Sequence, residues 1–365
     1  MLSRPLARPL AVIVASALLV AACAPATPTP SPAPPTPTPG PAAATPSPEP
    51  AATPAVAGMV TIYTGRHYGI EPVFDEFTAA TGIEVRFTTG SDPELRERLV
   101  AEGGNTPADV LMTADAGNIA LAAEAGVLAP IDSDVLEGAV PAELRDPQNR
   151  WFALSQRARV VIYSTERVTA PPTTYAEVGD PQWRGRVCLR PATHPYTQSL
   201  VSSMILADGE EAAERIVASW VANDPLYINS DTDIFKAVAA GDCDIAIANT
   251  YYLGRLIVPD PAFPVAISWP EQGAGGRGAH VNISAAAVTA HAPNPEAART
   301  LLEWLASDGQ RSFVDVNFEY PVNPDVAIHP VVAAWGEFRA DRSAVVELGR
   351  LQPTAVKLLD RVGYE

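Results

Sequence analysis

Residues 59–87 read MVTIYTGRHYGIEPVFDEFTAATGIEVRF. The first five and the last five of these residues are rich in β-branched and aromatic side chains, which predicts a strand at each end. Between the two strands, Val73, Phe74, Phe77 and Ala80 recur at the spacing of one helix face. A strand, a helix and a second strand in succession are typical of a parallel sheet, because parallel strands need a crossover to connect them.

The same alternation continues along the chain. Further runs typical of buried strands lie at 110–112, 160–163, 187–189, 244–248 and 281–285. Helical patterns lie between them, so we predict an α/β fold with mixed, mostly parallel sheets flanked by helices. The roughly 300 residues involved are too many for one such sheet and suit two lobes. Ligands in open α/β sheets bind beyond the carboxyl ends of strands, so we expect functional residues in the loops that follow the strands.

The N-terminal region has the composition of a targeting signal followed by a spacer. Two arginines precede an apolar run at 10–22 that is too short to span a bilayer, which is typical of a secretory signal peptide. The run ends at Cys23 in the sequence VAAC, which resembles a bacterial lipobox, whose Cys carries the lipid. Thirteen of the 37 prolines then fall between residues 25 and 54, and a tract of that composition predicts an extended spacer.

We therefore expect residues 1–22 to be a lipoprotein signal peptide and residues 23–57 to be a Pro-rich linker anchored to a membrane through Cys23. An ordinary signal peptide with an unrelated Cys remains the alternative. Both interpretations place the protein outside the cytoplasm, and the lipobox anchors it to the cell membrane, in the periplasm or on the outer face.

The chain is acidic, with 25 Lys and Arg against 42 Asp and Glu and a formal net charge of −17. Residues 1–57 contain two Arg and one Glu, so the remainder carries a net charge of −18. A protein that binds nucleic acid nonspecifically needs a basic surface to meet the phosphate backbone. We therefore expect no nucleic-acid partner.

Enzyme signatures are missing or misplaced in the sequence. Gly273, Gly275 and Gly278 match the G-x-G-x-x-G pattern of a dinucleotide site, but such a pattern follows a strand and opens a helix. Here it precedes the strand predicted at 281–285, so we interpret it as a loop. The sequence has no Walker A pattern, G-x-S-x-G elbow, H-E-x-x-H or C-x-x-C. We predict that the chain is not an enzyme.

Tyrosines follow three of the predicted strands, and they are Tyr68, Tyr196 and the adjacent pair Tyr251 and Tyr252. A tyrosine is protonated at neutral pH, because its reference pKa is about 10, unless a cation draws the proton off. Phenolate oxygens are hard ligands, and Fe³⁺ is the hard cation that several of them suit best. The pattern indicates a ferric site formed by these tyrosines, with His67 as a further candidate ligand. We expect His194 and His280 in loops or at the surface.

Two cysteines lie outside the N-terminal region. Cys188 and Cys243 each fall in or beside a predicted buried strand, and neighbouring parallel strands bring such positions together. A disulfide and a pair of buried thiols are both open at this point.

Several short motifs together resemble one known family. They are GRHY at 65–68, TPADVL at 106–111, SQRARV at 155–160, YTQSL at 196–200, NTYY at 249–252 and HVNIS at 280–284. They are similar to motifs of the ferric-ion substrate-binding proteins of bacterial ABC transporters, in particular the tyrosine-rich branch, and the resemblance covers residues 59–365. It implies a two-lobed periplasmic-binding-protein fold, type II-like, whose lobes close on the ion.

The resemblance also implies where the lobes begin and end. The first lobe takes residues 58–157 and 282–320, and the second takes residues 158–281 and 321–365. The chain crosses between the lobes near residues 155–160, 280–284 and 319–322.

The ligands and partners follow from the same resemblance. The first lobe supplies Tyr68 and His67, and the second supplies Tyr196, Tyr251 and Tyr252. Arg66 or Arg157 holds an anion such as carbonate beside the ion, or takes part in a structural ion pair. The implied partners are a membrane permease and a cytoplasmic ATPase on separate chains, and the protein itself is a monomer.

Two other functions remain open from the sequence. The same fold also serves small organic or oxoanion ligands such as a phosphonate, sulfate or thiamine, which Arg, Ser and backbone groups would hold. A secreted metal-dependent enzyme is the second alternative, but it needs an open coordination position and a placed general base, and no such base emerges from the sequence.

Overall fold

The computed structural model describes residues 58–66, 69–341, 345 and 347–365. The predicted signal peptide at 1–22, the linker at 23–57 with Cys23, and the predicted ligands His67 and Tyr68 lie outside the described residues. Within the described ranges, no helix is both long enough and apolar enough to cross a membrane.

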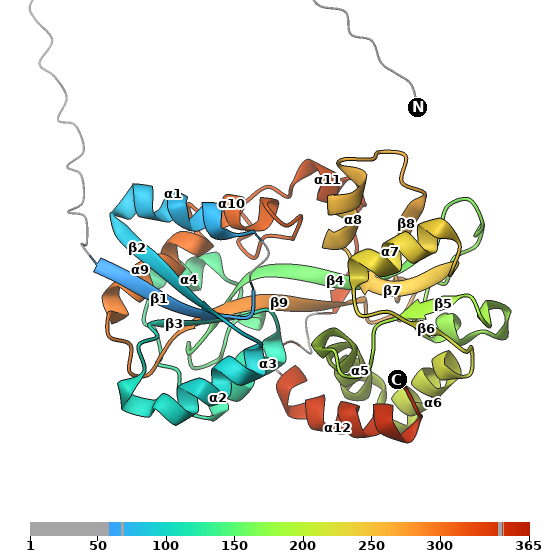
Figure 1. The fold of residues 1–365 in the computed structure, drawn as a ribbon, viewed down its shortest axis with the longest axis horizontal. Coiled ribbons are helices and arrows are strands. Elements are labelled where there is room, and N and C mark those ends of the chain that lie inside the picture. The colour runs from blue at the N-terminus through green and yellow to red at the C-terminus, as the bar shows by residue number, and fades with distance from the viewer. Residues whose placement is uncertain (1–57, 67–68, 342–344, 346) are drawn as a thin grey trace, which may run out of the picture. The chain divides into compact units, whose positions relative to one another are not determined.

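Strands and helices alternate along the chain, as the sequence pattern predicts (Figure 1). The strands are β1 (Gly58–Thr64), β2 (Ile83–Thr89), β3 (Val110–Thr113), β4 (Phe152–Ser164), β5 (Val187–Leu189), β6 (Leu226–Tyr227), β7 (Ile245–Asn249), β8 (Val265–Ser268), β9 (Ala279–Val288) and β10 (Ala340–Asp341). The helices are α1 (Glu71–Thr81), α2 (Asp92–Glu102), α3 (Ala116–Glu124), α4 (Asp134–Ala139), α5 (Pro195–Asp208), α6 (Glu210–Val221), α7 (Asp231–Ala240), α8 (Tyr251–Ile257), α9 (Pro295–Ala306), α10 (Gln310–Asp315), α11 (Pro330–Ala333) and α12 (Leu348–Arg361).

The strands join in the order β2-β1-β3-β9-β4-β7-β5-β6. β1 is parallel to β2 and β3, and β5 is parallel to β6 and β7. The middle of the sheet is antiparallel, because β9 runs against β3 and β4, and β4 runs against β7. The predicted α/β class with a mixed sheet flanked by helices is confirmed, but the strands join in one continuous sheet rather than in separate sheets, because the long strands β4 and β9 belong to both parallel regions.

The long strands β4 and β9 link the two parallel regions, and Figure 1 shows them running between β1–β3 and β5–β7. In β4, residues 152–158 pair with β9, whereas residues 159–163 pair with β7. In β9, residues 281–286 pair with β4 and residues 285–288 pair with β3. β4 therefore changes partners inside the predicted crossing at 155–160, while the crossings and the lobe limits stay predictions.

The register of these two strands puts polar side chains on a shared face. Ser155 lies opposite Ser284 and Arg157 lies opposite Asn282. Side chains alternate along a strand, so Ser155, Arg157 and Arg159 point to one face of β4, as His280, Asn282 and Ser284 do in β9. All six are buried, so this polar stripe lies inside the protein.

Two apolar clusters pack against the two faces of β7, in the region where β5, β6 and β7 are parallel. Along β7, Ile245 and Ile247 belong to the cluster with α5, α6 and α12, whereas Ala246 and Ala248 belong to the larger cluster that includes β1 and β9. This alternation is what a strand covered on both faces requires.

Local signals fix the ends of several helices. Ser91 caps α2 by accepting a hydrogen bond from the backbone N–H of Glu94, and the Glu94 side chain accepts one from the backbone of Ser91. This is a capping box. Helix α1 ends at Gly82, which has a φ of 75°, a left-handed conformation that glycine adopts without a Cβ penalty.

Cys188 of β5 and Cys243, which precedes β7, are joined by a disulfide with 5.8 Å between their Cα atoms. Both side chains are buried, and the parallel pairing of β5 with β7 brings them together. The bond closes a loop with a sequence separation of 55 residues. It therefore ties β5, which precedes Tyr196, to β7, which precedes Tyr251.

Replacing both cysteines, as Cys188→Ala with Cys243→Ala, should lower the free energy of unfolding by about 2–4 kcal/mol, because the cross-link no longer restricts the unfolded chain. Urea unfolding of residues 58–365 measures this difference. Wild-type protein treated with a reductant is the matched control and should lose a similar amount. Equal stability of the oxidised wild type and the double variant would contradict the assignment.

Candidate metal centre

Tyr251 and Tyr252 begin α8 directly beyond the carboxyl end of β7. Their rings are stacked, with centroids 4.2 Å apart and an interplanar angle of 29°. Tyr251 is buried and Tyr252 is half-buried. Two adjacent phenols are thus offered at the end of one strand.

Tyr196 reaches the same place from the first turn of α5, which follows β5. Its backbone N–H donates to Nδ1 of His194, the residue that caps this helix, over 3.2 Å. The hydroxyl oxygens of Tyr196 and Tyr251 lie 3.1 Å apart. The structure therefore brings together three predicted ligands: Tyr196, Tyr251 and Tyr252.

The spacing of the two hydroxyl oxygens suits a shared small cation. Octahedral Mg²⁺, the reference case for a small hard ion, has ligands at about 2.0–2.1 Å, which places neighbouring ligand oxygens about 2.9 Å apart. The 3.1 Å between Tyr196 and Tyr251 is close to that value. Little movement is needed for both oxygens to bind one ion.

Arginine side chains surround the ring of Tyr196. The guanidinium carbons of Arg157, Arg159 and Arg190 lie 5.3, 5.8 and 6.0 Å from its centroid. Asp231 pairs with both Arg159 and Arg190, each at 3.2 Å. Positive charges at this range favour the ionised form of a phenol, which is the form that binds a metal.

Arg157 stays charged in its buried position. Burial opposes its charge, but attraction from Tyr196, Glu319 and Tyr251 outweighs that effect and raises its pKa. One of its terminal nitrogens donates to the carbonyl of Ala114, and the other donates to the hydroxyl of Ser284 over 3.4 Å. Arg157 thus lies beside Tyr196, while its predicted role of holding an anion stays a prediction.

Arg66 lies in a different cluster. Its Nη1 is 2.8 Å from the Glu319 carboxylate, and both side chains are buried. Its connection to the tyrosines is indirect, because the Ser284 hydroxyl accepts from both Arg66 and Arg157.

The expectation that His280 lies in a loop or at the surface is wrong. β9 begins at Ala279, two residues before the predicted strand, so His280 is buried in the sheet. Burial, followed by the charges of Arg277, Arg159 and Arg157, lowers the pKa of His280 to about 3. His194 is half-buried, and burial, followed by Arg190, Arg159 and Arg157, lowers its pKa to about 3 as well. Both rings are neutral at physiological pH.

Sequence reasoning missed several residues around the phenols. Arg159 and Arg190 were not singled out, although the alternating polar pattern of SQRARV puts Arg159 on the same strand face as Arg157. Arg255 lies over the rings of Tyr251 and Tyr252, at 5.0 and 5.3 Å from the centroids. Its position four residues after Tyr251 in a helix was a signal for this contact.

The part of the chain that the structure describes contains no group of three or more His, Cys, Asp or Glu side chains placed to hold a metal. A gap too narrow to hold a water molecule lies beside Tyr196, between Arg157, Arg159, Asn249, His280 and Asn282. These are the residues of the polar stripe and the end of β7. The groups gathered here that suit a hard cation are the phenol oxygens of Tyr196 and Tyr251.

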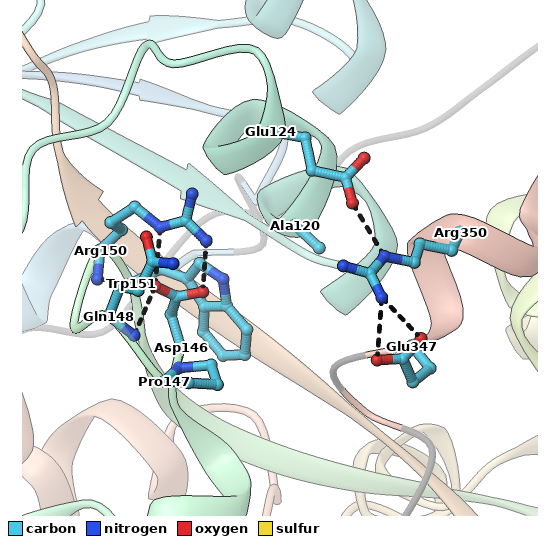
Figure 2. A pocket seen from close by; sticks show the side chains of 9 residues that line it. All are labelled: Ala120, Glu124, Asp146, Pro147, Gln148, Arg150, Trp151, Glu347 and Arg350. Carbon is cyan, nitrogen blue, oxygen red and sulfur yellow. Dashed lines mark hydrogen bonds and ion pairs between the residues drawn. The ribbon is translucent and has the colours of Figure 1, made fainter.

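A cavity lies between the loop at 146–151, α3 and the start of α12 (Figure 2). Its charged groups already pair with one another. Arg350 bonds Glu124 and Glu347 at 3.1 and 3.2 Å, and Arg150 bonds Asp146 at 2.7 Å. These carboxylates offer a metal much less than the phenols do, because binding would cost existing ion pairs.

Comparison with known proteins places the chain among solute-binding proteins. Residues 63–312 match a family described as bacterial extracellular solute-binding protein. The chain is 42% identical to Iron uptake protein A2 of Synechocystis sp. over 316 residues, which cover 84% of this chain and 90% of that protein. It is 39% identical to Iron uptake protein A1 of the same organism over 327 residues, which cover 86% of this chain and 90% of that protein.

A solved structure adds to this match. The Trichodesmium protein IdiA, also called FutA, in complex with iron and citrate ligands has a TM-score of 0.77 and 40% sequence identity to this chain. The match covers 84% of this chain and 100% of that one. The predicted two-lobed periplasmic-binding-protein fold is confirmed.

The buried neutral His280 predicts a pH dependence of stability. Its pKa is below its usual value in the folded protein, so the unfolded chain binds more protons, and stability falls as the pH drops below about 6.5. Between pH 7 and pH 5 this single residue should cost about 2 kcal/mol of unfolding free energy. His280→Gln should remove that part of the loss, as measured by urea unfolding at both pH values. The same loss in the variant as in the wild type would contradict the burial of a neutral His280.

Proposed function

We propose that this chain, which belongs to the bacterial extracellular solute-binding protein family, captures ferric iron outside the cytoplasm and delivers it to an ABC-type permease in the membrane. Its similarity to two iron uptake proteins and to an iron-bound structure supports this ligand. The family consists of solute-binding proteins rather than enzymes, in line with the missing enzyme signatures.

The ion is held by tyrosinate oxygens. Tyr196, Tyr251 and Tyr252 are the ligands from the second lobe, and Tyr68, with His67, completes the set from the first lobe. The 3.1 Å contact between the hydroxyl oxygens of Tyr196 and Tyr251 is the observation that carries this assignment. The phenols lose their protons on binding, and the guanidinium groups around Tyr196 stabilise the negative charge that results.

Ligands from both lobes make closure and binding one event. The ion favours closed lobes over open lobes only as far as it binds the closed arrangement more tightly. With phenols on the second lobe and Tyr68 on the first, only the closed arrangement supplies the complete set. The permease then releases the ion by separating the lobes.

An anion such as carbonate completes the coordination shell in this proposal. Arg157 holds the anion in this proposal, because it lies 5.3 Å from the centroid of the Tyr196 ring and its buried Nε has no hydrogen-bond partner among the described residues. Arg66 is already paired with Glu319, so it is the weaker candidate for the anion.

The chain is a monomer that works with a permease and a cytoplasmic ATPase on separate chains. It is tethered to the cell membrane, in the periplasm or on its outer face, through a lipid on Cys23 and the linker at 23–57. The net charge of −18 outside residues 1–57 favours the approach of a free cation and opposes that of an anionic iron chelate.

Tyr251→Phe combined with Tyr252→Phe should weaken ferric binding by about 100-fold or more. Changes to groups that only orient metal ligands already cost about 10- to 100-fold, and this double variant removes two ligands. Equilibrium competition with citrate measures the affinity. Tyr163→Phe is the matched control, because Tyr163 pairs with Ile245 at the other end of β7 from Asn249. Wild-type affinity in the folded double variant would refute the tyrosine assignment.

The lipid anchor has its own test in the full-length chain. Cys23→Ser removes the acceptor thiol and should move the protein from the membrane fraction of an expressing bacterium to the soluble fraction. A wild-type protein already in the soluble fraction would show that Cys23 carries no anchor.

A further inference from the structure

Arg66 contacts three separate chain segments with one nitrogen. Its Nη1 donates to the hydroxyl of Ser155 over 2.8 Å and to the hydroxyl of Ser284, and it is paired with Glu319 at 2.8 Å. Ser155 belongs to β4, Ser284 belongs to β9, and Glu319 follows α10. The Arg66 side chain is 1% exposed and that of Glu319 is 4% exposed, so this cluster is closed to water.

These segments are the three predicted crossings between the lobes, and they lie side by side. Ser155 is opposite Ser284 in the pairing of β4 with β9. On the other side of β4, Gln156 and Tyr320 exchange two backbone hydrogen bonds, each of 2.9 Å. Arg66, which follows β1, therefore contacts all three crossings where they lie side by side.

The cluster is poorly explained as a stabilising feature. A buried ion pair costs several kcal/mol per ion in desolvation, and apolar side chains of similar volume often serve stability as well or better. Moreover, Nε and Nη2 of Arg66 are buried without a hydrogen-bond partner among the described residues. The attraction between Arg66 and Glu319 offsets the desolvation cost only while the three crossings keep this arrangement. Moving Arg66 away from Glu319 would leave each of these charges buried without a partner.

The arrangement extends from Arg66 to the tyrosines. The Ser284 hydroxyl accepts from Arg66 and also from Arg157, at 3.4 Å in the second case. Arg157 in turn lies 5.3 Å from the centroid of the Tyr196 ring. Ser284 thus connects the Arg66 cluster to the cation that lies beside the ring of Tyr196.

We propose that Arg66 is a positioning residue that holds the three crossings in the arrangement in which Arg157 faces Tyr196, so that loss of the Arg66 contacts speeds iron release. This inference rests on the ferric function proposed above, and it adds a residue that controls release. The three crossings are the segments in which hinge motion between the lobes would be concentrated.

The test is the rate of iron release from loaded protein to excess chelator, followed by the loss of the visible tyrosinate-to-iron absorption. Arg66→Gln should speed release by about 10- to 100-fold, the range for residues that orient metal ligands. Glu319→Gln should do the same. The double variant should release iron no faster than either single variant, because both changes remove one shared contact.

Arg150→Gln is the matched control. Arg150 forms a partly buried ion pair with Asp146, at 2.7 Å, beside the cavity of Figure 2 rather than beside the phenols. It should lower the unfolding temperature without changing the release rate. If Arg66 served stability alone, Arg66→Gln and Arg150→Gln would both speed release, each in proportion to its loss of stability.

Wild-type release rates in folded Arg66→Gln and Glu319→Gln would overturn the inference, as would additive effects in the double variant. If Arg66→Gln does not fold, Ser284→Ala carries the test, because it removes the hydroxyl that Arg66 and Arg157 share. It should speed release several-fold, and an unchanged rate would again overturn the inference. Failure of the wild-type protein to bind Fe³⁺ would instead refute the proposed function, and this inference with it.

Discussion

The antiparallel pairing of β4 with β9 is the constraint on which the candidate site depends. Its register places Ser155 opposite Ser284 and Arg157 opposite Asn282, so a buried polar stripe runs along two strands that link both regions of the sheet. A slip of one residue would turn this stripe to the opposite face and remove Arg157 from Tyr196. The phenols come from α5 and α8, but two of the cations beside Tyr196, Arg157 and Arg159, come from this stripe.

The buried arginines around the candidate site outnumber the carboxylates that pair with them. Arg159 and Arg190 share the carboxylate of Asp231, and Arg66 has Glu319, whereas Arg157 bonds a carbonyl and a hydroxyl. Such a region attracts negative charge. In the proposed site, phenolates formed on metal binding would supply that charge, so that the protein environment and the cation would both favour loss of the same phenol protons. The same arginines help to keep His194 and His280 neutral, because further positive charge beside them would be unfavourable.

Much of the fold was predictable from the sequence, because periodicity reports which residues are buried. The strands around 59–63, 83–87 and 187–189 were found. Tyr196, Tyr251 and Tyr252 do follow strand ends, but they lie in the first turns of α5 and α8 rather than in loops. The length of β4 was underestimated, since its first half carries Ser155, Arg157 and Arg159 and does not look apolar. His280 was misplaced for the same reason, because a polar side chain in a buried strand needs partners that only the fold reveals. The Arg66 cluster joins residues from widely separated segments, and no local pattern signals such a contact.

Coordination of Fe³⁺ by phenolate oxygens has a direct signature in the visible absorption spectrum of residues 58–365 with one equivalent of Fe³⁺. Tyrosinate bound to Fe³⁺ gives a charge-transfer band in the visible region, so we expect a coloured protein whose band grows in proportion to added iron until the site is full. A protein that binds Fe³⁺ but stays colourless, or that binds none, would refute coordination by phenolates.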